Sequence, residues 1–166
     1  MTIQEQKIIE MIGEFAKKLP KFPDGRIDFT NSDTSLVLTV FIKYKYKILI
    51  LKRSNKVGTY QGKWNTVTGY LDEPKPLIEK IMEEMQEELG IKKDNILSHS
   101  LGEPFKFTDP KEKKTWIVHP VKIELKNKPD IKLDWEHTEY KWIKPEELKK
   151  FDTVPRLDLS LKKGLM

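Results

Sequence analysis

The segment from Leu77 to Ile91, "LIEKIMEEMQEELGI", restricts the possible folds more than any other part of the sequence. Its apolar residues recur with the 3.6-residue period of an α-helix, and a glycine near its end is a typical helix stop. A helix with one apolar face needs a partner surface, so the segment predicts a helix packed on a sheet. The residues that share the apolar face are Ile78, Ile81, Met82, Met85 and Leu89.

Four glutamates lie within residues 83–88 of this helix, with few cations to balance them. On a helical wheel Glu84, Glu87 and Glu88 fall within about 100° of one another, and Glu84 and Glu88 lie at the margin of the apolar face. Like charges four residues apart destabilise a helix by roughly 0.2–0.5 kcal/mol per pair, and Lys80 stands four residues before Glu84. A bound hard cation such as Mg²⁺ would remove this repulsion. The alternative is an acidic surface exposed to water.

Runs of β-branched and apolar residues on both sides of this helix predict strands. Together with the helices they give the order α-β-β-β-α-β-β-β-α, which predicts a mixed sheet with flanking helices, of the α/β or α+β class. The expected elements are a helix at 3–19, strands at 35–43, 47–53 and 63–69, the helix at 77–89, strands at 98–107, 114–125 and 138–143, a helix start within 144–151 and a last helix within 154–164.

The composition excludes several classes of site. The 166 residues include no cysteine, which excludes disulfides, thiolate metal sites and a cysteine nucleophile, and fits a reducing compartment. No apolar run approaches the ~20 residues of a membrane span, and no signal-peptide pattern follows Met1, so we expect a cytoplasmic protein without a membrane partner. A net charge of +5 weakly favours polyanionic partners, although the scattered cations favour a lysine-rich soluble surface over an RNA-binding face.

The spacing from Gly69 to Ile91 resembles the signature of the Nudix hydrolases. That signature is Gly, five residues, Glu, seven residues, Arg-Glu, an apolar residue, any residue, Glu-Glu, any residue, Gly and an apolar residue. The preceding strand hairpin, Trp64 and the later "EHTEYKWIKPEEL" also resemble the family, so that the similarity covers roughly residues 35–152. The matching positions of the signature are Gly69, Glu84, Met85, Glu87, Glu88, Gly90 and Ile91.

This resemblance implies a Nudix-type α/β/α sandwich. We expect it to occupy residues 31–166, preceded by an N-terminal helix and linker in residues 1–30, with a single globular domain overall. The N-terminal helix lies outside the resemblance, and its role is not indicated by the sequence.

Two positions depart from the signature and are opposite in sign. The first Glu is Lys75 here, and the Arg before the first helix glutamate is Glu83. We hypothesise that Lys75 and Glu83 form a reversed ion pair that ties the loop to the helix. Two unrelated surface changes are the alternative, and the loss of the Arg also leaves open a catalytically impaired module that binds a nucleotide without cleaving it.

The resemblance implies hydrolysis of the diphosphate bond in a nucleoside diphosphate derivative, with Mg²⁺ or Mn²⁺ as cofactor. The late stretch favours nucleoside triphosphates or dinucleoside polyphosphates as substrates. The implied catalytic residues are Glu84, Glu87 and Glu136. The implied metal ligands are the Gly69 carbonyl, Glu84, Glu87, Glu88 and Glu136.

The late carboxylate has two candidates in the stretch "DWEHTEYKW". Glu136, six residues before Trp142, is favoured as a metal ligand or as the base that activates water. Glu139 is interpreted as an exposed strand residue and His137 as a loop or packing residue. His99 and His119 have no acidic neighbours at a useful spacing and receive no role.

Substrate contacts are only weakly indicated. Arg53, Lys63 and Trp64, around the loop before the signature, are the candidates, with Lys56 as a further cation. Tyr60, Trp64, Tyr70 and Trp135 could stack on a base, although a structural role is favoured for each of the residues near this loop. A small nucleotide-type diphosphate is the expected partner, and a homodimer stays open. An isoprenoid-diphosphate isomerase of the same fold is set aside because that branch depends on a cysteine.

Overall fold

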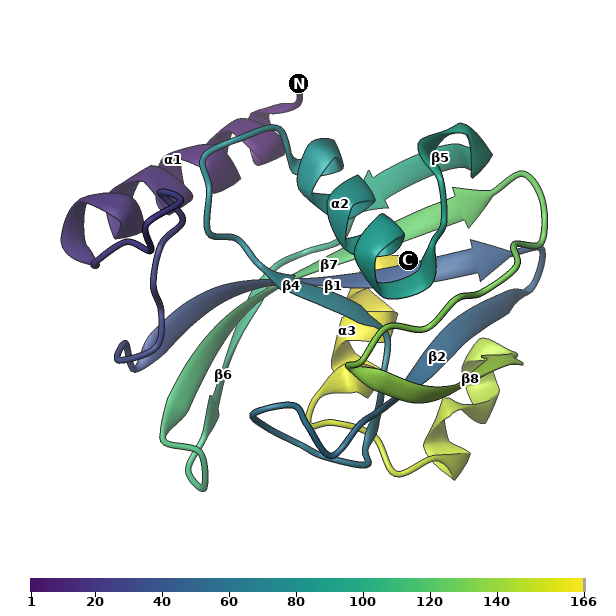
Figure 1. Ribbon diagram of the computed structural model, residues 1–166. Helices are drawn as coiled ribbons and strands as arrows, with labels where there is room; N and C mark the ends of the chain where they lie inside the picture. The colour runs from purple at the N-terminus through teal and green to yellow at the C-terminus, as the bar shows by residue number, and fades with distance from the viewer. Residues whose placement is uncertain (166) are drawn as a thin grey trace.

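A computed structural model describes residues 1–165 and shows a mixed sheet covered by helices, as the element order predicts (Figure 1). The sheet has eight strands where the sequence predicts six. The helices are α1 (Ile3–Lys18), α2 (Leu77–Leu89) and α3 (Leu157–Leu165), with short 3₁₀ turns η1 (Lys93–Asn95) and η2 (Pro145–Lys150). The strands are β1 (Thr34–Tyr44), β2 (Lys47–Arg53), β3 (Trp64–Asn65), β4 (Val67–Tyr70), β5 (Ile96–Leu101), β6 (Phe105–Asp109), β7 (Lys114–Leu125) and β8 (His137–Ile143). None of the helices in the described chain has the length and apolarity needed to cross a bilayer.

Two long strands organise the sheet. β1 and β7 run parallel and pair along ten positions, from Thr34 with Thr115 to Lys43 with Glu124. Each changes its outer neighbour along its length: β1 pairs first with β4 and then with β2, and β7 pairs first with β6 and then with β5. The order β3-β2-β1-β7-β5 results, with β8 on β2.

Alternating side chains of β1 and β2 supply two separate cores, because successive residues of a strand point to opposite faces. Val40 and Ile42 belong to the larger core, beneath α1 and α2. Phe41 and Ile48 belong to the smaller core on the opposite face, with Leu148 of η2 and the start of α3. The protein is therefore an α/β/α sandwich, as expected.

Three predicted elements differ from the structure. The strand expected at 98–107 is broken into β5 and β6 around Gly102 and Pro104, because proline cannot donate to a sheet and Gly102 packs tightly against the backbone of α3. The strand expected at 63–69 is split at Thr66, whose hydroxyl donates to Val40 O at 2.7 Å. The helix start expected within 144–151 is the 3₁₀ turn η2.

The helix α2 ends as predicted, but the face that it packs on the sheet is not the predicted one. Gly90 adopts a left-handed conformation (φ 71°) that closes the helix. Ile78 and Met82, expected to be buried, are only half-buried, which corrects the prediction. The buried face is rotated toward polar residues and includes Lys80 and Glu88, so that the acidic edge of the helix lies inside the fold.

Candidate active site

A cavity of about 350 Å³ opens beside the acidic edge of α2. Its walls come from the segment before β1, from β4 and α2, from the loop before β8, from the β6–β7 hairpin and from the residues that lead into α3. Three groups of side chains in its lining could take part in chemistry or binding. The predicted carboxylates are Glu84, Glu87 and Glu136, the aromatic residues are Tyr60, Tyr70, Phe105, Phe107 and Trp116, and the cations are Arg26, Arg53, Lys80 and Arg156.

Gly69 and Glu84 are in direct contact. Gly69 pairs with Leu38 in the sheet, and the Glu84 side chain lies on its backbone. A Cβ atom at position 69 would come within 2.6 Å of the Glu84 carboxyl group, closer than real Cβ contacts allow. Glycine is therefore required for this approach, which brings the Gly69 backbone and Glu84 together at the cavity wall.

Glu88 is buried behind Glu84, with only 1% of its surface exposed. No N–H group of the described residues donates to either of its carboxyl oxygens: its near neighbour is the Glu84 carboxyl group, and His137 Nε2 is 3.7 Å away. Burial raises the pKa of Glu88 well above its usual value, and the charges of Glu136, Glu84 and Asp134 raise it further. Because an unpaired buried carboxylate is costly, this position favours a bound cation.

Glu136 is held in place by backbone contacts at the end of its loop. Ser54 N donates to Glu136 O at 2.7 Å, and Glu136 N donates to Asp134 Oδ1 at 3.1 Å. Burial, then the charges of Asp134 and Glu84, raise the pKa of the Glu136 side chain to about 7. A carboxyl group with a pKa near neutrality is suited to proton transfer.

The carboxylate oxygens in this region are of the type that Mg²⁺ and Mn²⁺ bind in proteins. The unpartnered Glu88 carboxylate and the Gly69–Glu84 contact fit such an ion. In residues 1–165 no three acidic or histidine side chains already converge on one point as a metal site. Glu84 instead contacts Lys80, so an ion would have to compete with or displace that contact.

Lys80 is an internal counterion that sequence reasoning identified only in part. Its ammonium group lies 3.3 Å from Glu84 Oε1, the predicted four-residue spacing, and 3.1 Å from Asp72 Oδ1. Burial lowers the pKa of Lys80, but the charges of Glu84 and Asp72 more than offset this effect and raise it overall. Nothing in the sequence pattern indicated Asp72, because its approach to Lys80 depends on the path from β4 into α2.

The predicted ion pair between Lys75 and Glu83 is confirmed. Lys75 Nζ donates to Glu83 Oε1 and also lies 3.4 Å from Glu73 Oε1. Partial burial lowers the pKa of Lys75, whereas the hydrogen bond and charge of Glu83 raise it, and the net direction is upward. The two departures from the signature thus compensate each other, and the loop remains tied to α2.

The predicted substrate residues have different positions. Arg53 lines the cavity and donates from Nε to Thr59 O at 3.0 Å. Lys63 and Trp64 are not among the cavity-lining side chains. Lys63 instead pairs with Asp152 at 2.9 Å, and Trp64 packs edge-on against Phe151 in the smaller core.

The aromatic wall of the cavity comes mainly from residues that sequence reasoning did not single out. Phe105 and Phe107 of β6 and Trp116 of β7 face the cavity together with Tyr60, whose hydroxyl donates to Asp109 Oδ2 at 2.6 Å. Tyr70, a proposed stacking residue, also lines it, whereas Trp135 is 60% exposed and does not. The sequence indicates that Phe105 and Phe107 share one face of a strand, because they are two residues apart. Only the pairing of β6 with β7 shows that this face meets the cavity.

The remaining acidic and histidine candidates are placed as follows. Glu139 is an exposed residue of β8, 4.0 Å from Lys52 Nζ. His137 is buried between Glu88 and Asp134, and burial, followed by the charge of Arg53, lowers its pKa to about 4. It is therefore neutral at pH 7, and it packs against Glu88, outside the cavity lining. His119 is buried away from the cavity.

Comparisons with known proteins show which domain this chain resembles. A family model described as "NUDIX domain" matches residues 34–163. The nucleoside triphosphatase NudI of Klebsiella pneumoniae is 28% identical over 141 residues, which cover 78% of this chain and 96% of the relative. NudI of Salmonella paratyphi B is 27% identical over 127 residues, which cover 71% of this chain and 88% of the relative.

Solved structures share the fold. The MutT protein from Methanosarcina mazei superposes with a TM-score of 0.65 at 23% identity and covers 80% of this chain and 93% of its own. A C. elegans Ap4A hydrolase, solved as a binary complex, has a TM-score of 0.61 at 20% identity and covers 78% of this chain and 93% of its own. At these identities the structures support the fold alone.

Proposed function

This chain belongs to the NUDIX domain family, and on that basis we propose that it is a metal-dependent pyrophosphohydrolase of nucleoside diphosphate derivatives. The observation that carries the proposal is the buried, unpartnered Glu88 carboxylate behind Glu84. In front of it, Glu84, Glu87 and Glu136 line a cavity that aromatic and basic residues also line. Acidic groups suit a metal–diphosphate complex, and aromatic groups suit a base.

The Gly69 carbonyl, Glu84, Glu87, Glu88 and Glu136 would hold Mg²⁺ or Mn²⁺. When bound, the cation neutralises diphosphate oxygens and makes water a better nucleophile. Glu136, the carboxylate of the loop before β8, would accept the proton of the attacking water. Water oxygen forms a bond to phosphorus, the bond from that phosphorus to the bridging oxygen breaks, and the bridging oxygen leaves with the second phosphate.

Nucleoside triphosphates are the substrates that the cavity favours, ahead of dinucleoside polyphosphates. Its volume of about 350 Å³ is at the small end of ligand pockets and suits one nucleotide. Tyr60, Phe107 and Trp116 offer surfaces for a single base, and Arg53 is placed to meet phosphate. The name of the NudI relatives, nucleoside triphosphatases, supports the same preference.

The first test is phosphate and pyrophosphate release over a panel of nucleoside triphosphates, dinucleoside polyphosphates and sugar nucleotides, with Mg²⁺ and then Mn²⁺. We expect turnover that requires the metal, and we expect Glu84→Gln to lower kcat at least ~100-fold, since it removes a charge that holds the cation. Glu79→Gln is the matched control, because Glu79 is an exposed glutamate of the same helix outside the cavity; its kcat should match the wild type.

Nucleotide binding without turnover under these conditions would contradict the hydrolase. It would support the alternative, a module that binds a nucleotide without cleaving it. The Lys80–Glu84 contact of 3.3 Å favours this alternative, because Lys80 already neutralises the carboxylate of Glu84.

A further inference from the structure

The segment of residues 20–29, which precedes the matched family domain at residue 34, packs beside the site. Ile27 N donates to Asp72 O at 2.9 Å, which fixes the segment to the path from β4 into α2. Ile27 and Phe29 are buried, at 2% and 5% exposure, and the Phe29 ring stacks on Tyr70 of the cavity wall at 5.7 Å. This linker is therefore an integral part of the active-site surroundings.

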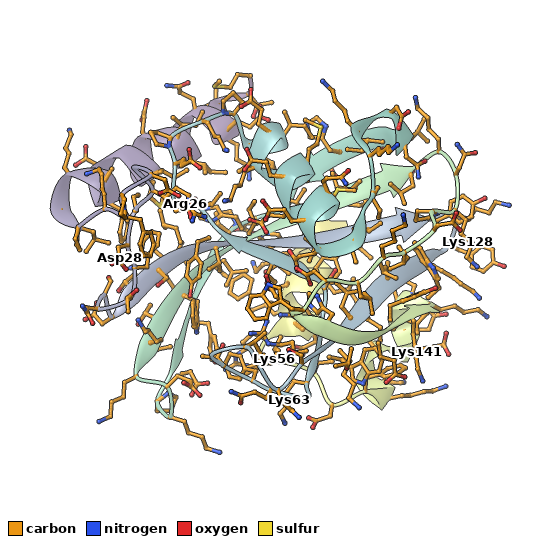
Figure 2. All side chains as sticks on the ribbon, viewed as in Figure 1. Arg26, Asp28, Lys56, Lys63, Lys128 and Lys141 are labelled. Atoms are coloured by element: carbon orange, nitrogen blue, oxygen red, sulfur yellow. The ribbon has the colours of Figure 1, made fainter. Side chains whose placement is uncertain are left out.

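Arg26 is the residue that this segment contributes to the cavity. Figure 2 shows it beside the segment that leads from β4 into α2, with Asp28 farther out. Its Nε donates to Asp24 Oδ2 at 2.8 Å, which orients the guanidinium group, and Nη1 lies 3.7 Å from Asp72 Oδ2. The side chain is 44% exposed. A guanidinium has five N–H donors, so Asp24 and Asp72 leave donors for a ligand.

The other cations that line the cavity lie at different places along its wall. Lys80 is buried between Asp72 and Glu84, and Arg53 is half-buried and donates to Thr59 O. Arg156 lies over the Phe107 ring at 5.6 Å, on the aromatic side. Arg26 instead stands on the acidic side, beside Asp72, which is the partner of Lys80. It is thus placed next to the metal-binding end, where the phosphates of a nucleotide would lie.

We propose that Arg26 binds the phosphate chain of the substrate, so that residues 20–29 complete the substrate site of the family domain. This inference rests on the proposed function, because it takes the substrate to be a nucleoside polyphosphate. Arginine suits this role since its planar fork of N–H groups matches the oxygens of a phosphate.

The test compares Arg26→Gln, Arg26→Lys and Lys18→Gln with the wild type. Lys18 is a matched control: it is an exposed cation of the same N-terminal region and is not among the cavity-lining residues. Binding of α,β-methylene-ATP with Mg²⁺ is measured by calorimetry, and KM and kcat are measured for any nucleotide that the wild type hydrolyses. Thermal unfolding of each variant is recorded beside these values.

We expect Arg26→Gln to weaken binding of the analogue and to raise KM about tenfold, with kcat little changed. Arg26→Lys should bind the analogue about threefold more weakly, since lysine keeps the charge but lacks the planar set of N–H donors. Lys18→Gln should bind it as the wild type does. Unchanged binding in Arg26→Gln, an equal loss in Lys18→Gln, or a wild type that neither binds the analogue nor hydrolyses a nucleotide would overturn the inference.

The outcomes separate this inference from the proposed function. A wild type that binds the analogue in an Arg26-dependent way but hydrolyses nothing supports the role of Arg26 and contradicts the hydrolase. A wild type that hydrolyses a nucleotide with the same KM in Arg26→Gln supports the hydrolase and contradicts the role of Arg26.

Discussion

Lys80 shows how one charged residue organises its surroundings. Lysine is almost never fully buried unless it is paired, and here only 6% of its surface is exposed. The two carboxylates that it contacts come from different elements, Asp72 from the loop after β4 and Glu84 from α2. A single side chain therefore neutralises two acids and joins the loop to the helix.

Removing this charge should destabilise the protein. Lys80→Met keeps most of the volume but leaves Asp72 and Glu84 without their cation, so we expect a loss of about 3 kcal/mol in the free energy of unfolding, measured with a chemical denaturant. Lys149→Met, at an exposed position of η2, should change it by less than about 0.5 kcal/mol. Equal losses in the two variants would show that the contacts of Lys80 contribute nothing of their own.

The reversed ion pair between Lys75 and Glu83 can be tested by exchanging its charges. Lys75→Glu places a third acid beside Glu73 and Glu83, and we expect it to lower the free energy of unfolding by about 0.5–1 kcal/mol, a modest value because both side chains are partly exposed. The double variant Lys75→Glu with Glu83→Lys restores the pair in the opposite sense and should recover most of the loss. If the loss of unfolding free energy in the double variant equals the sum of the losses in Lys75→Glu and in Glu83→Lys, the two residues are not coupled.

Glu136, in the loop before β8, makes the stability of the site depend on pH. The pKa of Glu136 is raised from 4.5 to about 7 in the folded protein, so the folded state binds more protons between these values than the unfolded state. This contribution to stability is present below pH 4.5 and is lost as the pH rises through 7. A divalent cation binds the deprotonated carboxylates and would replace the lost stability.

We therefore expect Mg²⁺ to raise the unfolding temperature more at pH 8 than at pH 6. At pH 6 most Glu136 side chains are protonated and proton release opposes binding of the ion. Glu136→Gln should reduce this pH dependence, and Glu139→Gln, at an exposed site of β8, should leave it unchanged. Scanning calorimetry at both pH values with and without Mg²⁺ provides the measurement. An equal shift at the two pH values would argue against Glu136 as a metal-site residue.

The sequence predicts an element well when the residues that determine it are close together in the chain. The helix of residues 77–89 and its end at Gly90 follow from periodicity within one short segment, and both are confirmed. The Lys75–Glu83 contact, also confirmed, was hypothesised from two opposite departures from the family signature in the same segment. The break between β5 and β6 was missed, because the predicted strand was followed across Pro104. Even with that break, periodicity does not show where β6 pairs.

The parts of the site that could not be predicted depend on long-range pairing. Phe105 lies opposite Val118 and Phe107 opposite Trp116, and these registers bring the hairpin against a cavity formed by α2. The contact between Asp72 and Lys80 needs the exact turn after β4. The burial of Glu88 depends on the rotation of α2 about its axis, and the sequence placed Glu88 only at the margin of the apolar face.

At the scale of the molecule, α1 and the matched domain share one core. Ile8 and Ile12 belong to the same buried cluster as Leu36 of β1 and Leu77 and Ile81 of α2. The ring centroid of the partly buried Phe15 lies 6.0 Å from that of Phe29, and the Phe29 ring stacks on Tyr70. Packing of the N-terminal helix therefore continues to the cavity wall, and we infer that the helix and the domain unfold together.

Two isoleucines of α1 allow a direct test of this coupling. Ile12 is 1% exposed and Ile3 is 78% exposed, so the same substitution removes core packing at one position and almost none at the other. We expect Ile12→Ala to lower the free energy of unfolding by about 3 kcal/mol and Ile3→Ala by less than about 0.5 kcal/mol. Because the core is shared, the loss in Ile12→Ala should move a single unfolding transition, with far-ultraviolet circular dichroism and tryptophan fluorescence changing together. A separate early transition in circular dichroism, with the fluorescence midpoint unchanged, would mean that α1 detaches on its own, and the position of Arg26 would then depend on a helix that binds only loosely to the domain.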